Sequence, residues 1–305
     1  MGLGKTLQAI TLLQALKEEQ GGRGTHLVVC PASLVYNWQE EFQRFAPGLR
    51  VQVIAGTAAQ RKRRIAELEQ NPPDVCVTSY DLLRKDIAAY GERRFSVMIL
   101  DEAQYIKNQK AGLTKAVKAV RAEHRFALTG TPIENRLAEL WSVFDFLMPG
   151  FLYAYPQFQR TFETPITKNH EEGPSARLRQ MTAPFILRRR KTEVLKDLPE
   201  KLEEVRYTRF EESQRKVYDG QVVRIRQLLA GGGGTGEERL MVFSELTRIR
   251  QICCDPSLIF EDYSGGSAKR EACLELIESA IGGGHRMLVF SQFTSMLARL
   301  EEDLQ

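Results

Sequence analysis

Phe95-Ser96-Val97-Met98-Ile99-Leu100-Asp101-Glu102-Ala103-Gln104 joins a short apolar run to two adjacent carboxylates. The run over 95–100 has the length and the large apolar side chains of a buried strand. An aspartate at a strand's end can hold Mg²⁺ through its water shell, and the next glutamate can orient and deprotonate an attacking water. Taken alone, the two carboxylates also fit the acidic start of an exposed helix, so the neighbouring sequence must separate these interpretations.

Similar short apolar runs recur over residues 1–150, with amphipathic stretches between them. The other expected strands are Leu27–Cys30, Val51–Ile54, Val75–Val77 and Phe126–Leu128. The expected helices between them include Ser33–Phe45, Ala58–Glu69, Ser79–Ala89 and Gly112–Arg121. This alternation predicts an α/β fold, a parallel sheet flanked by helices on both faces. Because such sheets bind ligands at the carboxyl ends of their strands, residues that directly follow strands are the candidates for chemistry.

A phosphate-binding pattern lies at the start of the chain. Gly2-Leu3-Gly4-Lys5-Thr6 precedes a helix-like stretch, Leu7–Lys17. Glycines let backbone N–H groups approach phosphates, Lys5 can neutralise the β- and γ-phosphates, and the Thr6 hydroxyl can reach Mg²⁺. We therefore predict that residues 2–6 bind nucleotide and that Thr6 and Asp101 hold the metal. The complete loop pattern would begin upstream of Met1, and residues 1–6 also fit an N-myristoylation pattern.

A third candidate site follows the strand expected over 126–128. There the chain reads Thr129-Gly130-Thr131-Pro132, and small hydroxyl residues at a strand tip can sense a bound nucleotide. A simple turn stopped by proline is the alternative. Motifs at residues 2–6, 101–104 and 129–131, in this order, favour a nucleotide-driven protein over three coincidences.

Composition and charge exclude several classes. The net charge of +4 permits a polyanionic partner without requiring one. Five cysteines without a C-x-x-C pair argue against a zinc site and fit reduced thiols in a cytoplasmic or nuclear protein. No apolar run approaches the ~20 residues that cross a bilayer, so no membrane partner is expected.

The pattern changes after Pro149-Gly150. Residues 151–262 read mainly as helices, including Glu211–Leu229 and Glu237–Cys253. A helix over Ala268–Ile281 and a strand over Met287–Phe290 then suggest the opening of another α/β unit. We expect three segments: 1–150, 151–262 and 263–305.

Together these motifs resemble the Swi/Snf-like ATPases of helicase superfamily two, over nearly the whole chain. Besides residues 1–6, 101–108 and 128–137, the resemblance is carried by Val29–Leu34 with Trp38, Thr78-Ser79-Tyr80, Phe185–Lys191 with Leu198-Pro199, Arg248–Cys253 with Pro256, and Leu288–Phe293. It implies a first RecA-like lobe over 1–150, a helical insertion over 151–262 and the start of a second RecA-like lobe over 263–305. It also leads us to expect a chain truncated at both ends, which binds nucleotide weakly and hydrolyses it poorly by itself because a later arginine finger is missing.

The implied activity is movement along double-stranded DNA driven by ATP and Mg²⁺, cytoplasmic and nucleoid-associated in a bacterium or nuclear in a eukaryote. Lys5, Asp101 and Glu102 would act in catalysis, and Gln104, which would also bind nucleotide, would couple hydrolysis to movement together with Thr129, Gly130 and Thr131. The DNA backbone contacts implied by the resemblance fall on Ser33, Asn37, Ser79 and Tyr80, for which capping and turn roles are the alternative. Further candidates are Arg188 and Arg189, whose basic run could instead be a solvated face or lie between the lobes, and Ser291 and Gln292. Trp38 is expected in the core, and the basic run 61–64 on a solvated helix face.

Two alternatives remain open at the level of sequence. The first is a non-catalytic DNA- or protein-binding module derived from such a motor, which ATPase assays with and without duplex DNA would distinguish. The second is an RNA helicase of the same superfamily, which strand-displacement assays on RNA and DNA duplexes would test. The long helical segment after residue 150 counts against the second alternative.

Overall fold

The computed structural model describes residues 3–19, 24–91, 93–130, 136–189, 191–194, 202–230 and 236–305. The chain divides into two compact units, Met1–Leu198 and Pro199–Gln305. Each unit is described by itself below.

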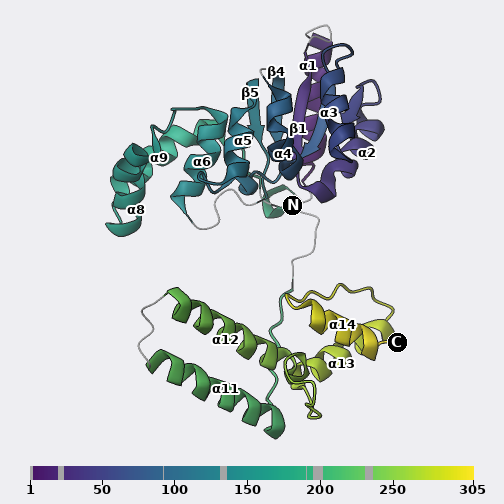
Figure 1. The fold of residues 1–305 in the computed structure, drawn as a ribbon, viewed down its shortest axis with the longest axis vertical. Coiled ribbons are helices and arrows are strands. Elements are labelled where there is room, and N and C mark those ends of the chain that lie inside the picture. The colour runs from purple at the N-terminus through teal and green to yellow at the C-terminus, as the bar shows by residue number, and fades with distance from the viewer. Residues whose placement is uncertain are drawn as a thin grey trace. The chain divides into compact units, whose positions relative to one another are not determined.

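The first unit is built on a parallel sheet of five strands in the order β2-β3-β1-β4-β5 (Figure 1). The strands are β1 His26–Cys30, β2 Val51–Val53, β3 Val75–Ser79, β4 Arg94–Leu100 and β5 Arg121–Ala127. This confirms the predicted α/β class and the position of each strand expected in this unit. The first half of β5 carries charged and largely exposed side chains at the edge of the sheet, so hydrophobic patterning alone detected only its end.

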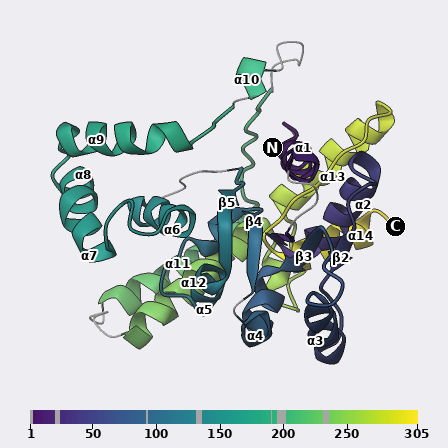
Figure 2. The ribbon, with the colours of Figure 1, turned by 90° about the horizontal axis from the view of Figure 1, so that it is seen from above.

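Helices cover both faces of the sheet (Figures 1 and 2). One face packs against α1 Lys5–Glu19 and, after the 3-10 turn Ala32–Leu34, α2 Val35–Phe45. The other face packs against α3 Ala58–Glu67, α4 Tyr80–Tyr90 and α5 Gly112–Ala119. Within β1, Val28 and Cys30 pack in the core under α1 and α2, while Leu27 and Val29 pack in the core under α3, α4 and α5. Burial on both faces explains why β1 is apolar without alternation.

The contact between α3 and α4 contains a buried ion pair that contradicts one prediction. Arg61 is only 7% exposed and Asp86 6%. Arg61 Nε lies 2.5 Å from Asp86 Oδ2 and Nη2 lies 3.0 Å from Oδ1, while Nη1 donates to the carbonyl of Gly56 at 2.6 Å. The expectation that the basic run 61–64 is a solvated face is therefore wrong for Arg61. The planar guanidinium forms a bidentate pair with a carboxylate 25 residues later in the chain. Hydrophobic patterning does not reveal such a partner.

The first unit continues beyond residue 150. Its later elements are α6 Leu137–Leu147, α7 Tyr155–Phe158, the π-helical turn Gln159–Glu163, α8 Thr164–Lys168, α9 Glu172–Thr182, the 3-10 turn Ala183–Phe185 and α10 Lys191–Val194. Phe144 of α6 shares a buried cluster with Leu152, Phe158, Phe162 and Leu178. This core spans the boundary expected between segments 1–150 and 151–262, so α7 and α9 pack with α6 in the first unit.

The second unit consists of helices. They are α11 Glu212–Ala230, α12 Gly236–Cys254, the 3-10 turn Pro256–Leu258, α13 Ala268–Gly282 and α14 Thr294–Asp303. The pair α11–α12 lies side by side, and Gln214 Nε2 of α11 donates to the carbonyl of Ile252 in α12 at 2.9 Å. Arg270 of α13 lies 3.0 Å from Asp255 and 2.5 Å from Asp303, so it ties α13 to its neighbours. Across the described residues of both units, no helix has the length and apolar character needed to span a membrane.

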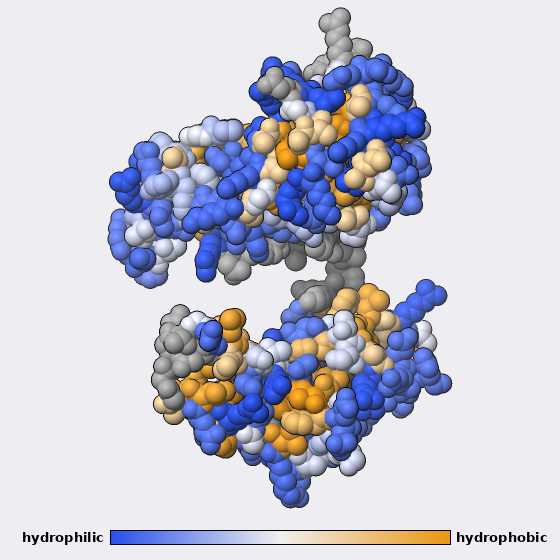
Figure 3. Space-filling model, viewed as in Figure 1, coloured by the Kyte–Doolittle hydropathy of each residue, from blue (hydrophilic) through white to orange (hydrophobic). Residues whose placement is uncertain are grey.

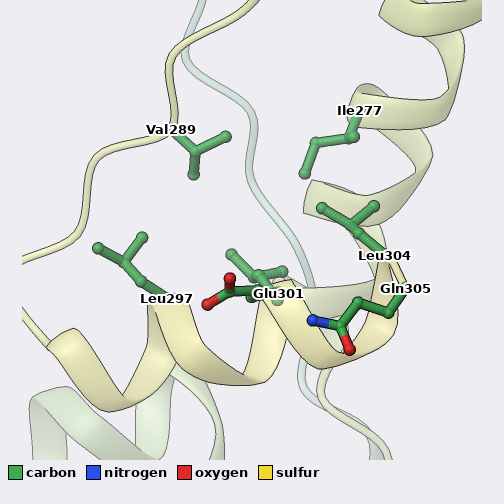
Figure 4. A pocket seen from close by; sticks show the side chains of 7 residues that line it. Ile277, Val289, Leu297, Glu301, Leu304 and Gln305 are labelled. Carbon is green, nitrogen blue, oxygen red and sulfur yellow. The ribbon is translucent and has the colours of Figure 1, made fainter.

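The strand expected over 287–290 is not formed. The backbone has no strand partner there, and Leu288 and Phe290 are 84% and 85% exposed. An apolar segment becomes a strand only when another strand satisfies its N–H and C=O groups, and the described part of this unit supplies none. The same segment borders a hollow of about 380 Å³ lined mainly by apolar side chains, among them Ile277, Val289 and Leu297 (Figure 4). Apolar surface is visible on this unit in Figure 3.

His26 makes the stability of the sheet depend on pH. Burial lowers the pKa of this β1 side chain below its usual 6.5, although the nearby Asp74 acts in the opposite direction. The unfolded chain therefore binds a proton more readily than the folded chain as the pH falls below about 6.5. We expect the free energy of unfolding to decrease from pH 7 to pH 5, with a contribution from His26 no steeper than about 1.4 kcal/mol per pH unit.

Urea denaturation followed by tryptophan fluorescence across this pH range tests the expectation. A His26→Leu chain, which carries no titratable group at this position, should show a flatter pH dependence. Asp74 titrates in a lower pH window. Burial acts to raise the pKa of Asp74, but the hydrogen bonds from Lys17 and from the Arg50 backbone N–H together outweigh it and lower the pKa below the usual 3.8. An unchanged pH dependence in His26→Leu would contradict the assignment.

Candidate active site

The loop that follows β4 is fixed by backbone bonds to the strands on either side. The N–H of Asp101 donates to the carbonyl of Val29 in β1, the strand next to β4, at 2.8 Å. The N–H of Ala103 donates to the carbonyl of Leu128 at 2.9 Å, just after β5. The carboxyl ends of β1, β4 and β5 therefore place residues 101–104 at one edge of the sheet, as a parallel sheet requires.

Asp101 is a buried carboxylate with bonds to both oxygens. It is 7% exposed; Trp38 Nε1 donates to Oδ2 at 3.0 Å and the N–H of Glu102 donates to Oδ1 at 3.0 Å. Burial raises its pKa above the usual value and is the largest influence, followed by the lowering effect of these two hydrogen bonds. The charge of Glu102 raises the pKa further and that of Lys5 lowers it. Lys5 is therefore close enough to Asp101 for its charge to affect the pKa of that carboxyl.

Glu102 has an unusual backbone conformation and a specific partner. Its φ of 51° lies in the left-handed region, which non-glycine residues adopt mainly where the surroundings enforce it. Gln104 Nε2 donates to Glu102 Oε2 at 2.6 Å, and Thr129 Oγ1 donates to Gln104 Oε1 at 2.8 Å. Side chains from the tips of β4 and β5 thus form a continuous chain of hydrogen bonds. Gly130 follows Thr129 and is exposed, whereas Thr131 lies outside the described residues.

Lys5 is the first residue of α1, at the positive N-terminal end of that helix. Gly4 precedes it with φ 72°, a left-handed conformation that suits glycine, and accepts the N–H of Gln8 at 3.0 Å. Buried Ala9, Ile10 and Leu13 fix α1 to the sheet. Leu3 and Thr6 are half-buried, while Gly2 lies outside the described residues. A helix start of this kind, with free N–H groups and a lysine, is suited to phosphate.

The oxygen donors at this edge are compatible with Mg²⁺. Each oxygen of Asp101 accepts one described hydrogen bond, which leaves further lone pairs, and Thr6 contributes a hydroxyl on α1. Mg²⁺ is usually held by one or two carboxylates together with waters and substrate phosphates. The donor set therefore fits a metal that arrives with a nucleotide.

The candidate DNA contacts of the first unit fall into two groups. Ser33 in the 3-10 turn before α2 and Asn37 in the first turn of α2 are exposed, as is the neighbouring Tyr36, which is 60% exposed. Ser79 and Tyr80 are each 2% exposed, so their expected role as DNA contacts is not supported. Ser79 accepts the N–H of Leu82 and caps α4 (3.4 Å), and Tyr80 donates to the carbonyl of Asp101 (2.8 Å); both side chains are used inside the protein.

The remaining candidates lie at the end of the first unit and in the second. Arg188 and Arg189 are exposed in a segment without regular structure. In the second unit, Gln292 is exposed and accepts a hydrogen bond from Arg250 at 2.5 Å, and half-buried Ser291 accepts the N–H of Phe293 at 3.1 Å.

Trp38 is the site residue that sequence analysis missed. Its burial in the core, 2% exposed, was expected, but its bond to Asp101 was not. The available signal was that a buried indole N–H needs an acceptor. The identity of that acceptor, 63 residues later, depended on the packing of α2 against β1 and β4.

Comparison with known proteins agrees with this geometry. A family model for the SNF2-related domain matches residues 1–258. The chain belongs to the SNF2-related family. The SNF2-related relatives include the TATA-binding protein-associated factor mot1 of Schizosaccharomyces pombe, 34% identical over 97% of this chain and 16% of its own length. Helicase ssl-1 of Caenorhabditis elegans is 38% identical over 85% of this chain and 11% of its own length.

Solved SNF2-related structures resemble the chain as a whole. The Sulfolobus solfataricus SWI2/SNF2 ATPase core in complex with dsDNA matches 97% of this chain and 62% of its own, with 34% identity and a TM-score of 0.59. The Sulfolobus solfataricus SWI2/SNF2 ATPase core domain matches 97% of this chain and 60% of its own, with 35% identity and a TM-score of 0.56. The likeness confirms the RecA-like sheet. The chain spans a third or less of the length of the first curated relatives that it matches.

Proposed function

We propose that this chain carries the ATP-binding lobe of a DNA translocase that moves along double-stranded DNA. The observation that supports the proposal is the position of Asp101 and Glu102 at the carboxyl edge of one parallel sheet, together with Lys5 at the start of α1, whose charge lowers the pKa of Asp101. Similarity to an SWI2/SNF2 ATPase core in complex with dsDNA supports ATP as substrate and duplex DNA as partner. Residues 263–305 would contribute the opening of a second RecA-like lobe, with the preceding helices as the insertion between the lobes.

Each residue of the site has a chemical role in this proposal. The helix start at Lys5 would bind the β- and γ-phosphates, and Thr6 with Asp101 would hold Mg²⁺. When bound, Mg²⁺ neutralises charge on the phosphate oxygens. Glu102 would accept a proton from the attacking water, and its bond to Gln104 keeps the carboxylate oriented. The link from Gln104 to Thr129 would pass the state of the nucleotide to the tip of β5.

Replacing Lys5 with alanine tests the nucleotide site. We expect the affinity for MgATP, measured by calorimetry on the chain, to fall at least about tenfold because a phosphate loses its cation, which corresponds to about 1.4 kcal/mol. Lys17→Ala is the matched control: it removes a lysine from the same helix, one that pairs with Asp74 at 2.8 Å, away from the acidic pair. Equal affinity in wild type and Lys5→Ala would refute the assignment.

ATP hydrolysis by the full-length gene product tests the choice of nucleic acid. We expect linear duplex DNA to stimulate hydrolysis more than single-stranded DNA or duplex RNA does, since the related SWI2/SNF2 ATPase core forms a complex with dsDNA. Stimulation by RNA alone would favour an RNA helicase. MgATP binding without any hydrolysis would favour a non-catalytic binding module.

A further inference from the structure

The indole of Trp38 donates a hydrogen bond to the carboxylate of Asp101. Trp38 is 2% exposed, and its ring packs beside Phe42 in the core between α2 and the sheet, with 5.8 Å between ring centroids. Its one polar atom, Nε1, donates to Asp101 Oδ2 at 3.0 Å. A rigid, fully packed side chain therefore presents a hydrogen-bond donor at a fixed point to an oxygen at the tip of β4.

Other groups bind the second carboxylate oxygen and the backbone carbonyl of Asp101. The N–H of Glu102 donates to Oδ1 at 3.0 Å, and Tyr80 donates to the backbone carbonyl at 2.8 Å. Tyr80 is itself immobilised by burial and by stacking on Tyr105, with 5.0 Å between ring centroids and 3° between ring planes. Each of these contacts restrains a different atom, and the Trp38 bond is the one that fixes the rotation of the carboxylate from a distant element.

We propose that Trp38 is a positioning residue, whose N–H holds the carboxylate of Asp101 in the orientation that receives the metal of bound MgATP. The inference rests on the proposed function of Asp101. A carboxylate oxygen that accepts one hydrogen bond still has a lone pair for a ligand, so the bond orients Asp101 without blocking it. Partners that orient a metal ligand in this way typically change metal affinity by about 10- to 100-fold when removed.

The test separates the metal-dependent part of ATP binding from the rest. Calorimetry gives the affinity of the 305-residue chain for ATP with Mg²⁺ and with excess EDTA, and the ratio of the two is the gain due to the metal. Trp38→Phe keeps an aromatic ring but lacks the N–H. We expect this variant to lower the ratio by about tenfold while the affinity for metal-free ATP changes by less than about twofold.

Two further variants interpret the result. Phe42→Leu disturbs the same core without touching Asp101, so it should lower stability and preserve the ratio. Asp101→Asn should show the ratio that remains without the carboxylate. The positioning role of Trp38 is overturned, and the role of Asp101 is kept, if two results are found together. The ratio of ATP affinities with and without Mg²⁺ is as high in Trp38→Phe as in wild type or higher, and the wild-type ratio exceeds that of Asp101→Asn. Failure of wild type to bind MgATP, or a wild-type ratio equal to that of Asp101→Asn, contradicts the proposed function instead.

A second measurement leaves Trp38 in place. The chain has two tryptophans, so Trp141→Phe makes Trp38 the sole reporter. We expect Trp38 emission to change when MgATP binds and to remain constant with ATP in EDTA, because the metal alters the charge on the oxygen that the indole contacts. Constant emission at MgATP concentrations shown by calorimetry to saturate the site would overturn the inference even if Trp38→Phe does not fold.

Discussion

Replacing Glu102 with glutamine is expected to lower the rate of ATP hydrolysis by about 10²–10⁴-fold, the usual contribution of a general base. The amide is nearly isosteric with the carboxylate but cannot take a proton from water. Gln104 can still bond to the side-chain oxygen of the glutamine, so the loop after β4 should keep its shape. The affinity for MgATP should therefore change little, in contrast to Lys5→Ala.

Hydrolysis would be measured on the full-length gene product with saturating duplex DNA, and binding by calorimetry. Glu123→Gln is the matched control, since Glu123 is an exposed carboxylate on β5 that pairs with Arg94 at 3.2 Å. A Glu102→Gln protein that hydrolyses ATP at the wild-type rate would show that another group takes the proton.

The second large effect concerns stability. Asp86→Ala is expected to lower the free energy of unfolding of the first unit by about 3 kcal/mol, because it leaves the guanidinium of Arg61 buried without its carboxylate. Trp38 and Trp141 both lie in this unit, so tryptophan fluorescence during urea denaturation reports on it specifically.

Two comparisons test whether the loss of stability arises because the unpaired charge of Arg61 is buried. Arg63→Ala breaks an exposed pair with Glu67 on the same helix and should cost less than about 1 kcal/mol. Replacing both partners, as Arg61→Met with Asp86→Leu, should recover most of the loss, because no unpaired charge then remains. A cost for Asp86→Ala no larger than that for Arg63→Ala would contradict the buried-pair interpretation.

Local signals were sufficient for the order of strands and helices in the first unit. The β4 run 95–100 and the all-buried β1 were recognised because a strand covered on both faces must be apolar throughout. Strands were predicted less well where their side chains are exposed rather than buried. The first half of β5 was missed for this reason, and the apolar segment 287–290 was expected to pair although the described structure provides no partner.

The sequence by itself determined the parallel α/β architecture and the edge of the sheet at which Asp101 and Glu102 lie, because strand tips in such a sheet share one side. Only the tertiary structure decided which groups complete the site and the core. Trp38 reaches Asp101 across 63 residues, Arg61 finds Asp86 across 25, and Tyr80 turns inward to the carbonyl of Asp101. These choices depend on hydrogen-bond partners that packing brings together, and no local periodicity specifies where a distant donor or acceptor will lie.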